Sequence, residues 1–193
     1  MPAAFSEIKD AVLDRLKGLD DHLTYHNVNH TLDVLAQSIR IAGAEKLNSD
    51  EDVFLLKVAA LYHDTGFLKA YRGHEKMSCE IFLEDADRFG FSQSQKELVQ
   101  GMIMATQVPQ KPVGILQEII CDADLDYLAR EDFYQSSDNL RKEFLHYHIV
   151  EDNDQWEDLQ LKFFENHRYH TSTSKKQREP ARQKHFAELL AHP

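Results

Sequence analysis

The chain has few of the residues that break helices, and few cysteines. Its 193 residues include 7 glycines, 5 prolines and 2 cysteines. Cys79 and Cys121 are far apart in the sequence and form no CxxC pair. This argues against a disulfide framework and against a cysteine-rich zinc site. Such cysteine usage is typical of a reducing compartment, so we expect a cytoplasmic protein.

Long apolar runs and an excess of positive charge are also missing. No segment approaches the roughly 20 apolar residues that cross a bilayer, and the first residues lack the basic and apolar regions of a secretory signal. We therefore expect no membrane association. The formal net charge is −11, whereas proteins that bind nucleic-acid backbones non-specifically carry a basic face. An anionic substrate would need local positive charge, and bound metal ions are one source of it.

Helical periodicity dominates the sequence, and β-branched alternating runs are scarce. The pattern predicts an all-α fold of about nine helices in a single domain over residues 1–193. In the second helix, Leu32, Leu35, Ile39 and Ile41 are expected to face inward. The polar stretch 170–178 reads as an exposed connection. The expected helices run from about Phe5 to Gly18, Asn29 to Gly43, Ser49 to Asp64, Met77 to Gly90 and Ser92 to Ile103, and over 115–129, 131–149, 154–166 and 179–191, with a loop at 108–114.

The pair His63-Asp64 is the most informative feature of the chain. It follows an almost unbroken apolar run over residues 53–62 and precedes Thr65-Gly66. Two polar side chains therefore occur where the pattern otherwise asks for burial. Burying a carboxylate is costly unless it is paired or coordinated to a metal. The pair therefore indicates a metal ion at the end of a buried helix.

Further histidines and acids stand at spacings that suit a metal site. His26 and His30 are four residues apart, so they share a face if both are helical, or His26 overhangs the helix start. Imidazole and carboxylate ligands together suit Mn, Fe, Zn, Ni or Co. Each piece also has a plainer interpretation: a chance HxxxH, a loop histidine at position 74, an acidic first turn of a helix. Besides the His63-Asp64 doublet and the His26/His30 pair, the candidate metal-binding groups are His74-Glu75 and the alternating acids Asp122, Asp124 and Asp126.

Surface positions are expected for His22, His185 and His192.

The order of these pieces resembles the HD superfamily of metal-dependent phosphohydrolases. That family has a histidine on an early helix, a His-Asp doublet two helices later, and a distal aspartate. The resemblance covers residues 25 to about 130 and implies an all-α fold. The segments that carry it are YHNVNHTLDV, AALYHDTGF, YRGHEKMS and CDADLDYL.

The resemblance implies roles for particular residues. His30, His63, Asp64 and Asp124 look like the metal ligands, with Asp124 preferred over Asp122. Asp122 is then a supporting residue or an ordinary helix-start acid.

Two more histidines resemble residues found in particular branches of the superfamily. His26 resembles a histidine that protonates the leaving oxygen in phosphodiesterases, and it could equally position a neighbour. His74 resembles a ligand to a second metal in binuclear members. Those members supply a further histidine before the distal aspartate, and this chain has none between His74 and Asp124. One tightly bound ion (Mn, Fe, Co, Ni, Zn or Mg) is therefore expected, with a weaker second ion possible.

Hydrolysis of a small phosphate ester is the chemistry that such a site implies, with a nucleotide or related metabolite as the expected substrate. Asp64 would orient the attacking water, and His26 or His74 would pass a proton to the leaving group. Arg72, and with it Lys69, would bind phosphate oxygens. The segment 167–171 either closes over the pocket or is a plain helix C-terminus, which we prefer.

Two other functions compete with this hypothesis: a di-iron oxygenase of the same superfamily, and a non-catalytic ligand-binding regulatory module. Lys111 and Arg130 are further phosphate-binding candidates near the motifs, with solvated surface charge as the alternative. The sequence does not specify the oligomeric state, nor whether the substrate is a monoester or a diester.

Overall fold

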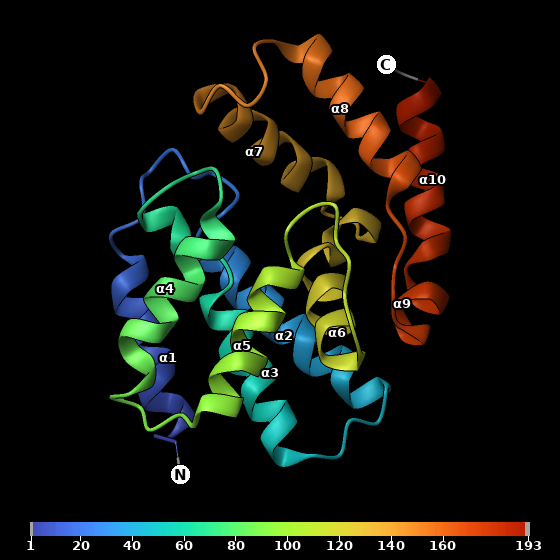
Figure 1. Cartoon of the computed structure of the whole chain (residues 1–193). Helices are drawn as coiled ribbons and strands as arrows, with labels where there is room; N and C mark the ends of the chain where they lie inside the picture. The colour runs from blue at the N-terminus through green and yellow to red at the C-terminus, as the bar shows by residue number, and fades with distance from the viewer. Residues whose placement is uncertain (1, 192–193) are drawn as a thin grey trace.

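The computed structural model describes residues 2–191, which form an all-α structure, as predicted (Figure 1). Within this range no strand occurs, and two one-turn 3-10 helices, η1 (Thr65–Leu68) and η2 (Asp126–Ala129), follow the third and sixth α-helices. The α-helices are α1 (Phe5–Leu16), α2 (Val28–Ala44), α3 (Asp50–Tyr62), α4 (His74–Ala86), α5 (Gln93–Ala105), α6 (Ile115–Asp124), α7 (Phe133–His146), α8 (Asn153–Asn166), α9 (Ser172–Gln177) and α10 (Glu179–Ala191).

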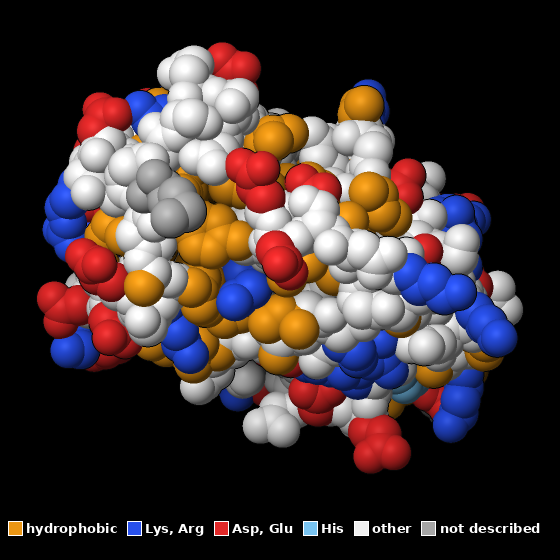
Figure 2. All heavy atoms as spheres, turned by 90° about the horizontal axis from the view of Figure 1, so that it is seen from below, with side chains coloured by type: hydrophobic (Ala, Val, Ile, Leu, Met, Phe, Trp, Pro, Cys, Tyr) orange, Lys and Arg blue, Asp and Glu red, His pale blue; other side chains and the backbone are white. Residues whose placement is uncertain are grey.

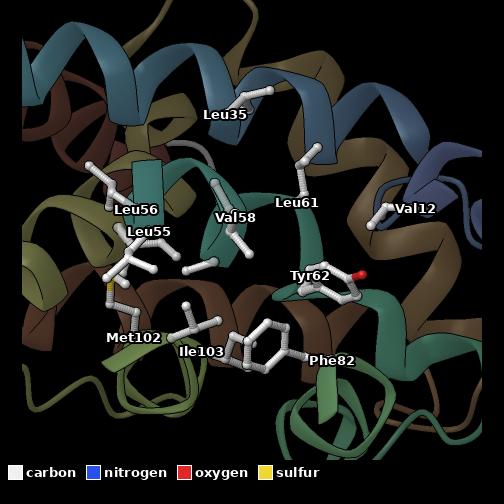
Figure 3. Packing of buried hydrophobic residues seen from close by; sticks show 14 of the residues in the cluster. Val12, Leu35, Leu55, Leu56, Val58, Leu61, Tyr62, Phe82, Met102 and Ile103 are labelled. Atoms are coloured by element: carbon white, nitrogen blue, oxygen red, sulfur yellow. The ribbon is translucent and has the colours of Figure 1, made fainter. Parts of the chain in front are cut away.

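The helix α3 lies at the centre of the larger hydrophobic core. It begins where Ser49 Oγ accepts a hydrogen bond from Asp52 N at 3.1 Å, a standard N-terminal cap. From Leu55 to Tyr62 every residue except Lys57 is fully buried. A helix that is apolar on all sides needs neighbours on all sides, and α1, α2, α5 and α6 pack against it. Figure 3 shows side chains of α3 among Val12, Leu35, Phe82, Met102 and Ile103.

A second, smaller core begins one residue after Asp124. Leu125, Leu128, Phe133 and Phe164 form its centre together with Tyr127. Leu125 joins α6 to η2, and the other residues come from η2, α7 and α8. The helix α10 packs on η2 and α8. In the view of Figure 1, α7 and α8 lie above the ends of α4, α5 and α6. The C-terminal helices thus extend the structure past the last predicted metal ligand.

Three details of the sequence prediction are wrong. The expected helix over 115–129 divides into α6 and η2. Ile39 faces outward and is 45% exposed, because the buried face of α2 passes through Ser38 and the next residue is turned by about 100°. The stretch 170–178 contains an additional short helix, α9, rather than an exposed connection: Thr171 and Ser174 are buried, and Thr171 Oγ1 caps the helix by accepting from Ser174 N.

The surface carries charges of both signs. On the face seen in Figure 2, Lys and Arg side chains are interspersed with Asp and Glu, and hydrophobic side chains are visible between them. Among the helices of residues 2–191, none has both the length and the apolar character that a membrane span requires.

Gly66 is predicted to be essential for stability. A Cβ at this position would lie 2.7 Å from Ser78 N and closer still to the carbonyl oxygen of His74, so the α4 backbone would have to move. Gly66→Ala should lower the free energy of unfolding by more than about 3 kcal/mol. The matched control is Gly43→Ala in α2, where nothing lies within 4 Å and alanine should stabilise the helix by up to about 1 kcal/mol. Urea unfolding of both variants tests this, and equal effects would contradict it.

Candidate metal centre

The His63-Asp64 pair lies where α3 gives way to η1. His63 is the C-cap residue that follows the last residue of α3, and Asp64 precedes η1. Ser78 of α4 holds this junction: its Oγ donates to His63 O at 2.6 Å and accepts from Gly66 N at 2.8 Å. The close approach of α4 that Gly66 permits therefore fixes the backbone of the doublet. Both side chains are buried.

Four side chains from three separate segments converge at this point. His30 lies in the first turn of α2, and Asp124 is the last residue of α6. The Nε2 atom of His30 is 3.3 Å from Asp64 Oδ2 and 3.2 Å from Asp124 Oδ1. The Nε2 atom of His63 is 3.2 Å and 3.7 Å from the same two oxygens. Ligand atoms of His30, His63 and Asp124 all lie within 4.8 Å of one another.

The donor set fits a divalent metal ion. Among the described residues, His30 Nε2, His63 Nε2 and Asp64 Oδ2 are buried without a hydrogen-bond partner, although such groups normally have one. His63 Nδ1 lies 2.9 Å from Ala60 O, so Nδ1 carries the hydrogen and Nε2 presents its lone pair. Bonds of about 2.1 Å to one ion would place its ligands roughly 3.0–3.4 Å apart, close to the distances seen here.

The charges in this cluster are strongly coupled. Burial lowers the pKa of His30, but the carboxylates of Asp124 and Asp64 outweigh this effect and raise it to about 9. Burial raises the pKa of Asp124, but His30 and His63 outweigh it and lower the value to about 2. The raised pKa of His30 means that a metal ion binding here competes with protons for the imidazole.

The geometry agrees with the comparison to known families. The HD domain family matches residues 27–129, more than half of the chain and a range that includes all four converging residues. The chain belongs to the HD domain family. HD domains are generally metal-dependent hydrolases and bind divalent metals. No curated protein and no solved structure matches the chain.

His26 precedes the HD range by one residue and is not part of α2. Asn27 caps that helix by accepting from Asn29 N, so His26 overhangs the helix start. Its Nδ1 contacts Glu143 Oε1, and its backbone N–H donates to Glu143 Oε2 at 3.1 Å. Tyr71 Oη also donates to Glu143 Oε1, at 2.8 Å. The carboxylate thus holds the Nδ1 side of the His26 ring and leaves Nε2 for other contacts.

Glu143 is the site residue that sequence reasoning missed. It belongs to α7, is fully buried, and lies beyond the HD range. Burial raises its pKa, but His26 and the donors around it keep the value below that of an ordinary glutamate. No motif surrounds it, and 117 residues separate it from His26. A glutamate spaced to fall among the apolar residues of a helix was the one available signal.

His74 lies on the other side of Asp64. It is the first residue of α4, and its Nε2 is 3.5 Å from Asp64 Oδ1. The same nitrogen is 3.7 Å from Glu75 Oε1, and the ring stacks on Phe67 with 3.9 Å between centroids. The two oxygens of Asp64 therefore face different partners: Oδ2 faces His30 and His63, and Oδ1 faces His74.

A cavity of about 470 Å³ opens onto these groups. His26, Asp64, Arg72, His74 and Asp124 all line it. These five residues, whose roles were predicted from separate motifs, therefore face one common space.

The other basic candidates do not line this cavity. The Nζ atom of Lys69 donates to Glu84 Oε1 at 2.9 Å, so its ammonium is paired outside the cavity and does not face a phosphate there. Lys111 is exposed. Arg130 binds Asp33 at 2.7 Å and also Asp132. The cavity wall therefore favours Arg72 alone among the basic candidates.

A smaller, polar cavity of about 300 Å³ borders the first at Tyr25 and Tyr127, which line both. It reaches His30 but neither Asp64 nor Asp124, and Arg130 in its wall is already paired. We therefore assign the chemistry to the larger cavity, which contains both carboxylates.

The three alternating acids serve three different purposes. Asp124 joins the two histidines, whereas Asp122 accepts hydrogen bonds from the backbone of residues 170–171 at 2.8 Å each. Asp126 is fully buried and pairs at 2.8 Å with Arg40 and Arg178. Asp122 and Asp124 lie in the last turn of α6, so the interpretation as a helix-start turn is wrong for these two, whereas Asp126 is the first residue of η2. The preference for Asp124 over Asp122 agrees with this geometry.

The segment 167–171 is a helix C-terminus, as preferred. Arg168 Nη1 donates to the carbonyl oxygens of Glu165 and His167, and no residue of the segment lines the larger cavity. Of the histidines expected at the surface, His22 is exposed. His185 is not: its Nδ1 lies 3.0 Å from Leu128 O and its ring stacks on a core phenylalanine. His192 lies outside the described residues.

His167 should make the protein less stable in mild acid. Burial, with the nearby Arg182, lowers its pKa to about 4. At pH 7 the ring is neutral whether folded or unfolded, but between pH 6.5 and 4 the unfolded chain takes up a proton that the native state resists. Stability should fall over this window by up to about 3 kcal/mol.

His167→Phe should remove this part of the pH dependence, because phenylalanine cannot take up a proton. The new ring should be tolerated, because Phe163 already stacks on the imidazole it replaces. Unfolding at pH 7, 5.5 and 4.5 compares the two proteins. A constant stability difference between them across this range would refute the assignment.

Proposed function

We propose that this protein hydrolyses a small phosphate ester by means of a divalent metal ion held by His30, His63, Asp64 and Asp124. The observation that carries the proposal is the convergence of these four side chains beside a cavity large enough for a substrate, which Asp64 and Asp124 line. The other two and Asp64 are buried, and each has an unpartnered ligand atom. Membership of the HD domain family supports the same reaction class.

The residues around the cavity suit the individual steps. A bound divalent ion would supply Lewis-acid activation of water and of a phosphoryl oxygen. Asp64 Oδ1 faces His74 on the cavity side of the cluster and can accept a proton from the attacking water. The phosphorus–oxygen bond to the organic group then breaks, and His26 Nε2 donates a proton to the leaving oxygen. Arg72 would bind the non-bridging phosphate oxygens.

We infer one tightly held ion. Imidazole and carboxylate donors accept Mn, Fe, Co, Ni or Zn, and Mg is a further candidate. A weaker second ion would use Asp64 Oδ1 and His74 Nε2, which lie 3.5 Å apart. In that case His74 would be a ligand and His26 alone would act as the acid.

Metal reconstitution tests the proposed reaction. The protein is stripped with chelator, and hydrolysis of mono- and bis-p-nitrophenyl phosphate is measured after adding Mn, Co, Ni, Zn, Mg or Fe(II) anaerobically. At least one metal should raise the rate by about 100-fold or more over stripped protein, and Asp64→Ala should lose this response. The proposal fails if no metal accelerates hydrolysis, or if Asp64→Ala responds as the unaltered protein does.

A further inference from the structure

The cavity beside the metal ligands is larger than a phosphate group requires, and much of its wall is apolar. Leu140 and Phe144 of α7 and Trp156, Leu159 and Phe163 of α8 all line it. These residues lie beyond the HD range of 27–129, so the family match does not account for them. The phosphate-handling groups and this apolar wall face one continuous space, which one molecule can fill.

The charges in the wall limit the number of phosphates. Among residues 2–191, Arg72 is the one lysine or arginine that lines the cavity, while Asp64, Glu75 and Asp124 also line it. A substrate with one phosphoryl group matches one metal ion and one arginine. A triphosphate would bring further negative charge toward carboxylates with no further cation to receive it.

Two polar side chains in the wall already have partners. Gln160 Nε2 donates to Ser137 Oγ, and Tyr71 Oη donates to Glu143. Along α7 and α8 the lining side chains are aliphatic or aromatic except for Gln160, so a nucleobase edge or several sugar hydroxyls lying there would lose water without gaining equivalent hydrogen bonds. An unsatisfied buried polar group is costly, whereas apolar surface gains by contact with this wall.

We propose that the substrate carries a single phosphoryl group on a large apolar organic group, which lies against α7 and α8. This assignment rests on the proposed hydrolysis and narrows its substrate class. The nucleotide expected from the resemblance is the competing class.

Esters of n-alkyl alcohols test the assignment, because their leaving groups have nearly equal acidity. With metal-loaded protein, kcat/KM should rise about 100-fold from ethyl to octyl phosphate. Octyl phosphate should also be hydrolysed faster than AMP or ATP at equal low concentration. Calorimetry with ethyl- and octylphosphonate measures the same preference without turnover, and octylphosphonate should bind at least about tenfold more tightly.

Two leucines of equal exposure provide a matched pair of variants. Leu159 lines the cavity and Leu83 of α4 does not, and each is 39% exposed. Leu159→Asn should weaken octylphosphonate binding about tenfold or more and lower the ratio of kcat/KM for octyl phosphate to that for ethyl phosphate. Leu83→Asn, the matched control outside the cavity, should change neither the binding nor the ratio.

The outcomes separate the two proposals. Hydrolysis without dependence on chain length, AMP or ATP as the better substrate, or equal effects of the two leucine variants would overturn the substrate class and leave phosphoester hydrolysis standing. Failure to hydrolyse any ester with any metal would overturn the proposed function and the substrate class with it.

Discussion

Replacing His63 with alanine is expected to abolish tight metal binding and to reduce hydrolysis to the rate of metal-stripped protein. His63 is fully buried, and its Nε2 lies within 4 Å of both carboxylates of the cluster. Loss of a group that merely orients a ligand costs about 10- to 100-fold in metal affinity or activity. Loss of a ligand should therefore lower metal affinity by at least about 100-fold. Metal analysis after gel filtration should fall from about one ion per chain to near zero.

The control for this variant is His22→Ala. The side chain of His22 is 60% exposed and lines neither cavity, so its loss should change neither metal content nor rate. Circular dichroism must show that His63→Ala keeps its helices, because the imidazole also contacts Ala60 O. A folded His63→Ala protein that retains one ion per chain would contradict the metal assignment.

His26→Gln is expected to lower kcat by about 10²- to 10⁴-fold for an alkyl phosphate, with little change in KM. The reason is that Glu143 holds the Nδ1 side of the ring and leaves Nε2 to protonate the leaving oxygen. A p-nitrophenyl ester needs little protonation, because its leaving group is already a weak base. The same variant should therefore lose less than about tenfold on that ester.

Glu143→Gln should act through His26 and not separately. Glutamine keeps the shape of the side chain but loses the charge that faces the imidazole, so kcat on alkyl phosphates should fall about 10- to 100-fold. The double variant His26→Gln/Glu143→Gln should be no slower than His26→Gln alone. Multiplicative losses in the double variant, or equal losses of His26→Gln on both esters, would contradict proton donation by His26.

Local patterns explain why much of the site can be predicted from the sequence. The apolar run before His63 predicts a fully buried helix, and α3 is one. A carboxylate at the end of such a helix needs a compensating charge, which indicates a metal ion. His30 and Asp124 follow from the order of motifs, and both converge on the doublet. These predictions depend on residues close in sequence to a recognisable pattern.

The contributions that the sequence does not predict depend on tertiary contacts. Glu143 reaches His26 from α7, and nothing near either residue in the sequence indicates the other. Lys69 follows the doublet closely in the sequence, yet its ammonium turns to Glu84. The polar stretch 170–178 has the hydrophilic composition of a solvent-exposed segment. The burial of Thr171 within it depends on the Asp122 carboxylate, which satisfies the backbone N–H groups of residues 170–171.

The most direct test of the central claim is anomalous X-ray diffraction from crystals of the protein loaded with Mn or Zn. One strong peak should lie about 2.0–2.3 Å from His30 Nε2, His63 Nε2 and an oxygen each of Asp64 and Asp124. A weaker peak near Asp64 Oδ1 and His74 would add the second ion. Crystals that show no peak among these four residues, or an ion bound elsewhere in the chain, would contradict the account.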